Sequence, residues 1–271
     1  MNEILPDSAL HLGFKRFTPR PELTALVECF WAIGGAGAPV QCFSEKVYPD
    51  GGCSLSIEID AQYAKAALTC NKYTTRQQFS THCLTISARL LPAALFALFK
   101  LSPGELLSNY HDASLLLTGY AKRSLQQLLA QLPQRNLASA IALFEQWLLL
   151  QIKQNGHNTV PERVTQILQQ LHLQHGTTAA AAAALGISRR TQERQMTLHT
   201  GFNPAYFKHC LQIKQARQLL CQRVSTLADI AVSSGFYDQA HFSHAFTGFV
   251  GETPAQYRAR KLSQIYNTAQ R

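Results

Sequence analysis

The stretch that decides the fold runs from Leu227 to Arg258 and reads LADIAVSSGFYDQAHFSHAFTGFVGETPAQYR. Apolar residues recur every three or four positions in both halves, as on the buried faces of two short helices: Leu227, Ile230, Ala231, Phe242, Ala245, Phe246 and Phe249. Gly235 lies between them, where a turn needs positive φ, and Asp238 lies where an N-cap oxygen meets free backbone N–H groups. The pattern predicts a helix-turn-helix.

The second of these helices carries polar residues opposite its apolar face. Gln239, His241 and His244 have side chains that can form hydrogen bonds with base edges or phosphate groups. Because a helix-turn-helix places its second helix in the major groove of DNA, these side chains are candidate DNA contacts.

A second unit of the same kind lies upstream. Thr177 is a candidate N-cap for a helix with six consecutive alanines, residues 179–184, which have high helix propensity and allow close packing. Gly186 supplies the turn, Ser188 is a candidate N-cap for the next helix, and Gly201 ends that helix. The sequence thus predicts two helix-turn-helix units within residues 156–271.

Three arginines lie near the start of the upstream recognition helix, at Arg189, Arg190 and Arg194. Arginine on a helix most often forms a solvated basic face. Here the cap, the turn and the second unit downstream favour contacts with bases and phosphates. A helix from Pro204 to about Cys221 joins the units, and its 18 residues span roughly 27 Å. Such a rod can hold two recognition helices about one DNA turn apart, roughly 34 Å.

Both units resemble the AraC/XylS family of bacterial transcription regulators. Fixed spacings carry the resemblance in the second unit: Ile230, Ala231, Gly235, Phe236, Asp238, Gln239, His241, Phe242, Ser243, Phe246, Gly251, Thr253, Pro254, Tyr257 and Arg258. The first unit matches at Ile187, Ser188, Arg190, Thr191, Glu193, Arg194, Thr200, Gly201 and Pro204. The resemblance implies that the base-reading positions are Arg190, Glu193, Arg194, Gln239, Ala240, His241 and His244.

The chain departs from the family pattern at five positions. Gln192 and Met196 replace a usual Leu and Phe, so the first unit should have a softer core. Gln212 stands where Arg is common. His244 and Thr247 replace a frequent Arg and Lys, and because histidine is mostly uncharged near neutral pH, the second unit should hold phosphate less firmly.

Residues 1–155 show a different pattern, strand-rich over 11–90 and helical over 93–153. Leu55, Ile57 and Ile59 alternate with polar residues, as in a strand with one buried face. Residues 82–89 alternate in the same way, whereas Pro21 to Trp31 has the apolar spacing of a helix. Shorter helical segments are expected over 93–99 and 103–107.

Two longer amphipathic helices are expected over residues 114–153, joined near Pro133. Their apolar residues, among them Leu125 and Phe144, can either cover the sheet of the same domain or pair with a second copy of the chain. The sequence leaves these two alternatives open.

This first part resembles the N-terminal sensor domain of some members of the same family. The matching features are Tyr48-Pro-Asp-Gly-Gly before a strand, Arg89-Leu-Leu-Pro, and the segment from Leu101 to Leu106. The resemblance implies a small β-barrel-like fold followed by helices, of a type that usually holds a small ligand. The expected fold class is therefore α+β, with an all-α double helix-turn-helix domain after the sensor.

Composition and charge are consistent with two domains of different roles. The chain of 271 residues is 46% hydrophobic and 15% charged, as in a folded globular protein. Residues 156–271 hold 12 Lys+Arg and 5 Asp+Glu, a net charge of +7, whereas residues 1–155 hold 13 and 11, a net charge of +2. This asymmetry favours a polyanion as partner of the C-terminal part.

The seven cysteines and the polar first residues predict a reduced, cytoplasmic protein without a secretion signal or a membrane span. The cysteine count is odd, no C-x-x-C occurs, and we expect no metal site and no required disulfide: Cys29, Cys42, Cys53, Cys70, Cys83, Cys210 and Cys221. His82 is the single histidine of residues 12–110, too few for a metal-dependent barrel.

We therefore expect a transcription regulator that is not an enzyme and needs no cofactor or catalytic residue. Its partners would be double-stranded promoter DNA, a small-molecule effector on unknown residues, RNA polymerase if it activates, and a second copy if the chain dimerises. Two other interpretations are a barrel enzyme fused to a DNA-binding tail, and a constitutive DNA-binding protein whose first domain only dimerises. The effector, the operator and the sign of regulation do not follow from the sequence.

Overall fold

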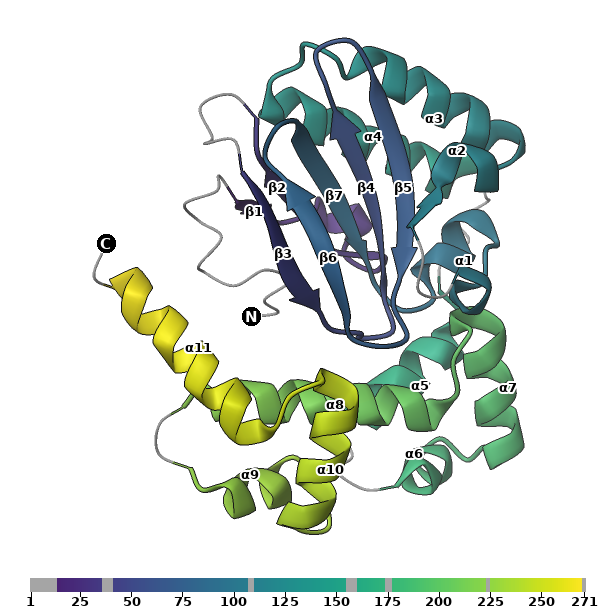
Figure 1. Ribbon diagram of the computed structural model, residues 1–271. Helices are drawn as coiled ribbons and strands as arrows, with labels where there is room; N and C mark the ends of the chain where they lie inside the picture. Colours follow the sequence, from purple (N-terminus) through teal and green to yellow (C-terminus); the bar gives the residue numbers. More distant parts are fainter. Residues whose placement is uncertain are drawn as a thin grey trace.

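The computed structural model describes residues 14–35, 41–106, 110–154, 160–173, 177–222 and 225–269, with side chains described to residue 262. A sheet with covering helices forms the N-terminal part, and helices alone form the C-terminal part (Figure 1). This arrangement confirms the predicted α+β class. The polar segment that we expected to separate the domains, residues 154–159, lies almost wholly outside the described residues.

The larger sheet has the strand order β1-β2-β7-β4-β5-β8, and every neighbouring pair is antiparallel. Its strands are β1 (Lys15–Phe17), β2 (Val27–Ile33), β4 (Cys53–Ile59), β5 (Ala64–Cys70), β7 (Leu84–Leu90) and β8 (Tyr110–Asp112). In β4, buried and half-buried residues alternate, as predicted from Leu55, Ile57 and Ile59. The short strand β8 was not predicted, because it lies in the stretch expected to be helical.

A second sheet consists of β3 (Cys42–Val47) and β6 (Thr75–Ser80). Phe43 and Phe79 stack with ring centroids 5.4 Å apart, and Phe79 packs edge-on against Trp31 of the larger sheet. The two sheets thus enclose an aromatic cluster. The β-rich domain is as expected, but the described strands pair as two separate sheets, and their hydrogen bonds do not close a barrel.

The prediction of a helix over Pro21 to Trp31 is wrong. The structure has a short 3-10 helix, η2 (Pro21–Leu23), followed by strand β2. Six of the seven residues of β2 are buried, because the strand lies between β1 and β7 with both faces covered. A strand buried on both faces shows a continuous apolar run, which imitates the spacing of a buried helix.

Helices cover one face of the larger sheet (Figure 1). They are α1 (Ala94–Phe99), η3 (Pro103–Leu106), α2 (Ala113–Leu116), α3 (Gly119–Gln131) and α4 (Leu137–Gln154). Phe144 of α4 packs edge-on against Phe30 of β2, at a centroid distance of 5.6 Å, and Leu125 of α3 is fully buried. Of the two alternatives for these helices, the structure shows the one in which they cover their own sheet.

Cys53 and Cys70 form a disulfide between β4 and β5, against our expectation that the cysteines are free thiols. The two residues lie directly opposite each other in the antiparallel register, with Cα atoms 4.6 Å apart. This proximity comes from the pairing of the strands, which the sequence alone did not show. The remaining five cysteines form no disulfide in the structure.

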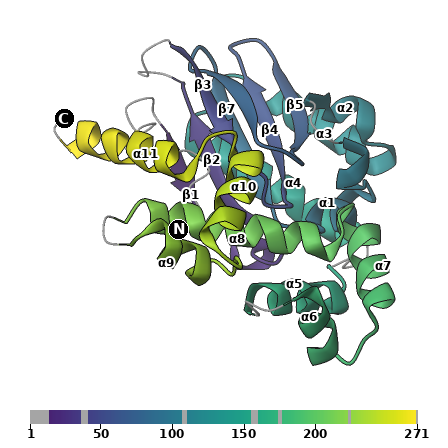
Figure 2. The ribbon, with the colours of Figure 1, turned by 60° about the horizontal axis from the view of Figure 1, so that its bottom comes forward.

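The C-terminal part consists of α5 (Glu162–Leu173), α6 (Thr178–Ala184), α7 (Arg189–Thr200), α8 (Pro204–Leu220), α9 (Leu227–Ser233), α10 (Gln239–Val250) and α11 (Pro254–Ala269). Helices α5 to α7 share one apolar core and α9 to α11 share another. Helix α8 contributes to both cores and runs across from one to the other (Figures 1 and 2). This is the predicted pair of helix-turn-helix units joined by a long helix.

Candidate nucleic-acid interface

Helices α9 and α10 form the unit that the sequence indicated most clearly. Thr226 caps α9 through a capping box with Asp229, and Gly235 adopts φ +75° in the turn. The carboxylate of Asp238 then accepts a hydrogen bond from the backbone N–H of His241 at 2.7 Å. The predicted N-cap and turn are confirmed, and they fix where α10 begins.

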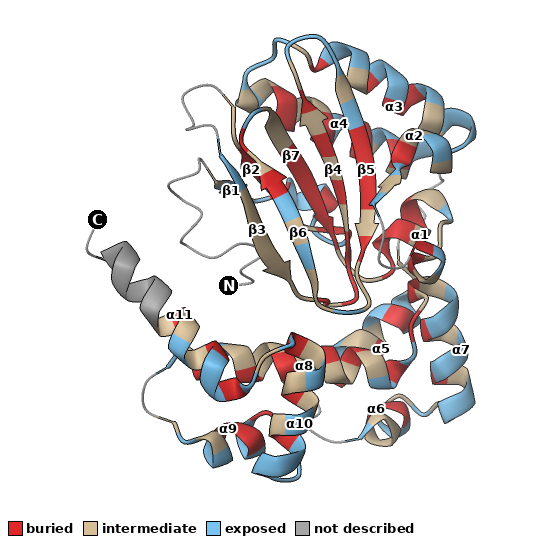
Figure 3. Ribbon diagram, in the orientation of Figure 1, coloured by how far each residue is buried: buried red, intermediate tan, exposed pale blue. Residues whose placement is uncertain are grey.

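The two faces of α10 differ as predicted. Phe242, Phe246 and Val250 are fully buried against α9 and α11. The opposite face is exposed and carries the four residues assigned to DNA contact in this unit: Gln239, Ala240, His241 and His244. Figure 3 shows this exposed surface at the lower end of α10.

Helices α6 and α7 repeat the construction. The hydroxyl of Thr177 caps α6, Gly186 adopts φ +62° in the turn, and the hydroxyl of Ser188 accepts a hydrogen bond from the Thr191 N–H at 3.1 Å. Within the alanine run, Ala181 and Ala182 are buried, whereas Ala183 and Ala184 are exposed. The middle of the run therefore provides the close packing that we expected of this helix.

The polar face of α7 is exposed along its first two turns. It carries the four residues assigned to DNA contact in the first unit: Arg189, Arg190, Glu193 and Arg194. Each recognition helix has 12 residues, begins at a side-chain cap and ends at a glycine with positive φ, Gly201 in α7 and Gly251 in α10. Their N-terminal ends, where backbone N–H groups and the helix dipole attract anions, lie next to the exposed side chains.

Two departures from the family pattern lie in the core of the first unit. Met196 is fully buried and fills its place in the core. Gln192 is 1% exposed, and its Nε2 finds no hydrogen-bond partner among the described residues. A buried amide without a partner costs stability, which agrees with the expectation of a softer core here.

A third departure has a structural role that the sequence did not reveal. The side-chain amide of Gln212 in α8 donates a hydrogen bond to the carbonyl oxygen of Gly235 at 2.6 Å. Gln215, one turn further along α8, donates to the carbonyl oxygen of Ser233 at 2.8 Å. These two bonds hold the end of α9 and the turn against α8.

The sequence also gave no role to Tyr237, which lies beside the Asp238 cap and is 90% exposed. Leu198 on α7 and Val232 on α9 are exposed apolar residues of the same two units. Tyr237 directly precedes an N-cap residue. This position in the sequence could have predicted that its side chain is exposed.

The C-terminal units contact the N-terminal part around a cavity of about 240 Å³. Its walls come from both domains, and three of its residues are cationic: Arg89 of β7 and Lys214 and Arg217 of α8. Arg89 forms an ion pair with Asp50 and donates a hydrogen bond to Ser54. Burial lowers the pKa of Lys214, although Glu28 and Asp50 favour its charged form.

The aromatic side of this cavity is formed by Trp31, Tyr48, Phe79, Phe249 and Tyr257. The guanidinium carbon of Arg217 lies 3.6 Å from the centre of the Tyr48 ring, and its Nε donates a hydrogen bond to the Tyr257 hydroxyl. Burial raises the pKa of Tyr257 to about 12. An adjoining cavity of about 450 Å³, between β2 and α5, shares Asp50 and Lys214 with the first.

Among the described residues, no helix is long and apolar enough to cross a membrane. Across the same residues, no three side chains of His, Cys, Asp or Glu lie together in a way that could hold a metal ion.

Residues 181–260 match the family model described as a helix-turn-helix domain, and residues 15–112 match one described as a domain of unknown function (DUF6597). The HTH-type transcriptional activator RhaS of Escherichia fergusonii is 37% identical over 79 residues, which is 29% of this chain and 28% of RhaS. RhaS of Escherichia coli strain SE11 is 30% identical over 150 residues, 50% of this chain and 54% of RhaS. These matches thus span about half of the curated relatives or less.

Among solved structures, a transcriptional regulator of Chromobacterium violaceum with an AraC-type DNA-binding domain is similar at 27% identity. The match covers 36% of this chain and 91% of that chain, with a TM-score of 0.35. The fold and the capped, exposed recognition helices define a double helix-turn-helix protein. The sequence matches to HTH-type transcription regulators agree with the AraC/XylS-type double helix-turn-helix expected within residues 156–271.

Proposed function

We propose that the chain is a sequence-specific DNA-binding transcription regulator, in which residues 156–271 bind promoter DNA and residues 1–155 sense a small molecule. The observation that carries the proposal is the pair of matched recognition helices. Each begins at a side-chain cap and exposes its first two turns, while its apolar face is buried. That is the construction with which a helix enters the major groove.

The exposed side chains suit particular base edges. Arg190 and Arg194 can donate bidentate hydrogen bonds to guanine, and Gln239 can bind adenine in the same way. Glu193 can accept from the amino group of cytosine, and Ala240 can contact a thymine methyl group. Arg189, His241 and His244 remain available to bases or phosphates. The first unit has three fixed positive charges, so we expect it to supply most of the specific affinity.

The cavity between the domains is the proposed effector site. Its walls carry three cations, and Asp50 is the carboxylate among its lining residues. Lys214 forms no hydrogen bond or ion pair within the described part of the chain and lies on α8, the helix shared by both DNA-binding units. A small organic anion with an apolar body fits this combination of cationic and aromatic walls. Its binding would link the sensor part directly to α8.

The remaining partners follow from this function. A regulator of promoters acts in the cytoplasm, contacts RNA polymerase if it activates, and gains a second DNA-binding domain if it forms a homodimer. We favour a regulator over an enzyme because the assigned side chains lie on two exposed helix surfaces rather than in a water-excluding cleft. The dimer would have to use surfaces other than the faces of α3 and α4 that cover the sheet.

The DNA-binding proposal is tested by selecting genomic fragments with the full chain and measuring affinity for the enriched sequence. Arg190→Ala should weaken binding by about 10-fold or more, since a base-reading pair contributes about 1–3 kcal/mol. Arg163→Ala is the matched control, because Arg163 is an exposed arginine of α5 outside both recognition helices. Equal loss in both variants, or no enriched sequence, would contradict sequence-specific reading.

The effector proposal has a separate test. A thermal-shift screen of small carboxylates and phosphates should find compounds that stabilise the wild-type chain. Those compounds should have a much smaller effect on Lys214→Met, while Lys15→Met, an exposed control on β1, should respond like wild type. A ligand that stabilises all three proteins equally does not bind at this cavity.

A further inference from the structure

Both recognition helices end against the N-terminal part of the chain. In Figure 1 the C-terminal ends of α7 and α10 point up towards the sheet and its helices, and their N-terminal ends point away. We propose that the N-terminal domain is a brace that fixes the distance and angle between α7 and α10, and thereby sets the half-site spacing that the chain accepts. This inference rests on the proposed function, that these two helices read DNA.

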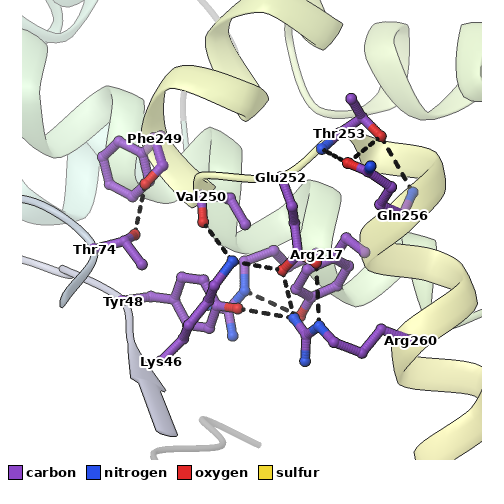
Figure 4. Close-up of polar contacts among 11 residues, drawn as sticks. Lys46, Tyr48, Thr74, Arg217, Phe249, Val250, Glu252, Thr253, Gln256 and Arg260 are labelled. Carbon is purple, nitrogen blue, oxygen red and sulfur yellow. Dashed lines mark hydrogen bonds and ion pairs between the residues drawn. The ribbon is translucent and has the colours of Figure 1, made fainter. Parts of the chain in front are cut away.

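The first contact lies at the end of α10. The last carbonyl groups of a helix have no partner within it. Here the carbonyl oxygen of Phe249 accepts a hydrogen bond from the Thr74 hydroxyl at 2.5 Å, and that of Val250 accepts one from the Lys46 ammonium at 3.2 Å (Figure 4). Both donors belong to the N-terminal domain, and a cation at this end also matches the helix dipole.

An ion-pair network extends this contact into α11. Lys46 pairs with Glu252 at 3.0 Å, and Glu252 pairs with Arg260 at 2.6 Å. Arg260 in turn donates a hydrogen bond to the hydroxyl of Tyr48, just after β3 (Figure 4). The side chains of Lys46 and Glu252 are only 18% and 13% exposed, so water screens this pair weakly. The network holds the junction of α10 and α11 in one place relative to β3.

The second contact lies at the end of α7. A methyl group built on Gly201, the residue that ends α7, would lie 2.2 Å from the backbone nitrogen of Gly104. The two backbones therefore touch without any side chain between them. Two residues earlier in the chain, His199 packs edge-on against Phe96 of α1, with ring centroids 5.0 Å apart. The N-terminal domain thus reaches α7 at the same place along the helix as it reaches α10.

A third contact lies between these two, at the start of α8. The hydroxyl of Tyr206 donates to the carbonyl oxygens of Asn71 and Lys72, which lie between β5 and β6. Helix α8 alone would fix the separation of the two units along its axis but would resist their rotation about that axis less firmly. Contacts on both sides of α8 also restrict rotation, which decides whether two helices fit successive major grooves.

The brace leaves the reading surfaces free. The eight side chains assigned to DNA contact are all exposed in the same structure that contains these contacts. The N-terminal domain therefore holds the recognition helices by their far ends without covering them, and its contacts are compatible with DNA binding.

The test uses the full chain and DNA fragments with the enriched paired half-sites, either at their selected spacing or with one base pair inserted. The insertion moves the half-sites apart by about 3.4 Å and rotates them by roughly 34°. Wild type should bind the inserted fragment about 10-fold or more weakly. In the double variant Lys46→Met, Thr74→Val this penalty should fall below about 3-fold, while Lys15→Met keeps the wild-type penalty.

A second variant tests the brace at its contact with the end of α7. Gly104→Ala places a methyl group 3.1 Å from the Gly201 carbonyl oxygen and 3.2 Å from its Cα, so α7 must shift or turn slightly. In Gly104→Ala, the loss of affinity caused by the inserted base pair should also be smaller than in wild type. This substitution leaves the contacts of α10 intact. This variant tests the proposal even if the double variant is poorly folded.

Hydrogen exchange without DNA gives an independent measurement. The backbone amides of the last turn of α10 should exchange about 10-fold faster in the double variant than in wild type. In Lys15→Met they should exchange at the wild-type rate. Unchanged exchange, or a full spacing penalty in both the double variant and Gly104→Ala, would overturn the brace while leaving DNA binding in place. Absence of sequence-specific binding by the wild-type chain would instead overturn the proposed function and the spacing role with it.

Discussion

The amide of Gln212 donates to the carbonyl oxygen of Gly235 at 2.6 Å, which ties the turn of the second helix-turn-helix unit to α8. The family pattern commonly has an arginine at this position, and in this chain the glutamine holds the turn through its side-chain amide. A partly buried carbonyl that loses its donor costs about 1–3 kcal/mol.

Gln212→Leu should therefore lower the free energy of unfolding by about 1–2 kcal/mol. Gln215→Leu is the matched comparison, because its hydrogen bond to Ser233 is exposed to water and water can replace the lost donor. Urea unfolding should give a smaller loss for Gln215→Leu. An equal loss in both variants would mean that the Gly235 contact has no special role.

Gln192→Leu should have the opposite effect. The side chain of Gln192 is buried, its Nε2 has no partner within the described residues, and leucine has a similar volume. Replacing a buried polar group without a partner by an apolar group should stabilise the first unit by about 1 kcal/mol. A higher urea midpoint at unchanged slope would support this prediction. Destabilisation would show that Gln192 has a bonding role that this conformation does not reveal.

The contact between Lys46, Glu252 and Arg260 should weaken in acid. Burial alone would raise the pKa of Glu252, but hydrogen bonds from Arg260 and Lys46 outweigh burial and lower it below the ordinary value of 4.5. A carboxylate with a lowered folded-state pKa stabilises the fold above its unfolded-state pKa, and this stabilisation is lost as pH falls through the folded-state value. The stabilisation that the Glu252 carboxylate contributes should thus be complete above about pH 5 and should decline below about pH 4.5.

Comparison of wild type with Glu252→Gln isolates this dependence from the other carboxylates. The variant should be less stable by about 1 kcal/mol at pH 7, and the difference should shrink below about pH 4.5. A difference that stays constant from pH 7 to pH 3 would show that the glutamate acts through packing rather than charge.

The two recognition helices should contribute unequally to DNA affinity. Arg194 carries a fixed charge whose planar guanidinium can form bidentate contacts, whereas the imidazole of His244 offers only single hydrogen bonds. Arg194→Ala should therefore cost more affinity than His244→Ala, by about 10-fold. Gel-shift titrations of both variants on one selected site measure the difference, and the reverse ranking would show that Gln192 leaves the arginines poorly placed.

The features that could be predicted from the sequence are those decided by neighbouring residues. Ser188 and Asp238 cap the helices that follow them, and Gly186 and Gly235 form the turns, because each needs only a few adjacent residues. Strand β4 was predicted because one of its faces is buried and the other is not. The helix expected over Pro21 to Trp31 failed because β2 is buried on both faces, which depends on strands far away in the sequence.

The contacts between domains could not be predicted in this way. Lys46 and Val250 are 204 residues apart, and nothing near either residue indicates the other. The pairing of Cys53 with Cys70 depends on the register of β4 and β5 in the same manner. The sequence thus indicated which polar residues lie exposed on α7 and α10, whereas the cavity and the interdomain contacts, which join distant segments, required the structure.

The most direct test of the central claim is a footprint of the full chain on its selected promoter fragment. We predict two protected segments whose centres lie about 10 base pairs apart on one face of the duplex, as expected for two recognition helices in successive major grooves. Protection of both segments should be lost together when salt is raised from about 50 to 200 mM, because each unit releases counterions from the phosphates. Protection of a single segment, or uniform protection without sequence preference, would contradict the account.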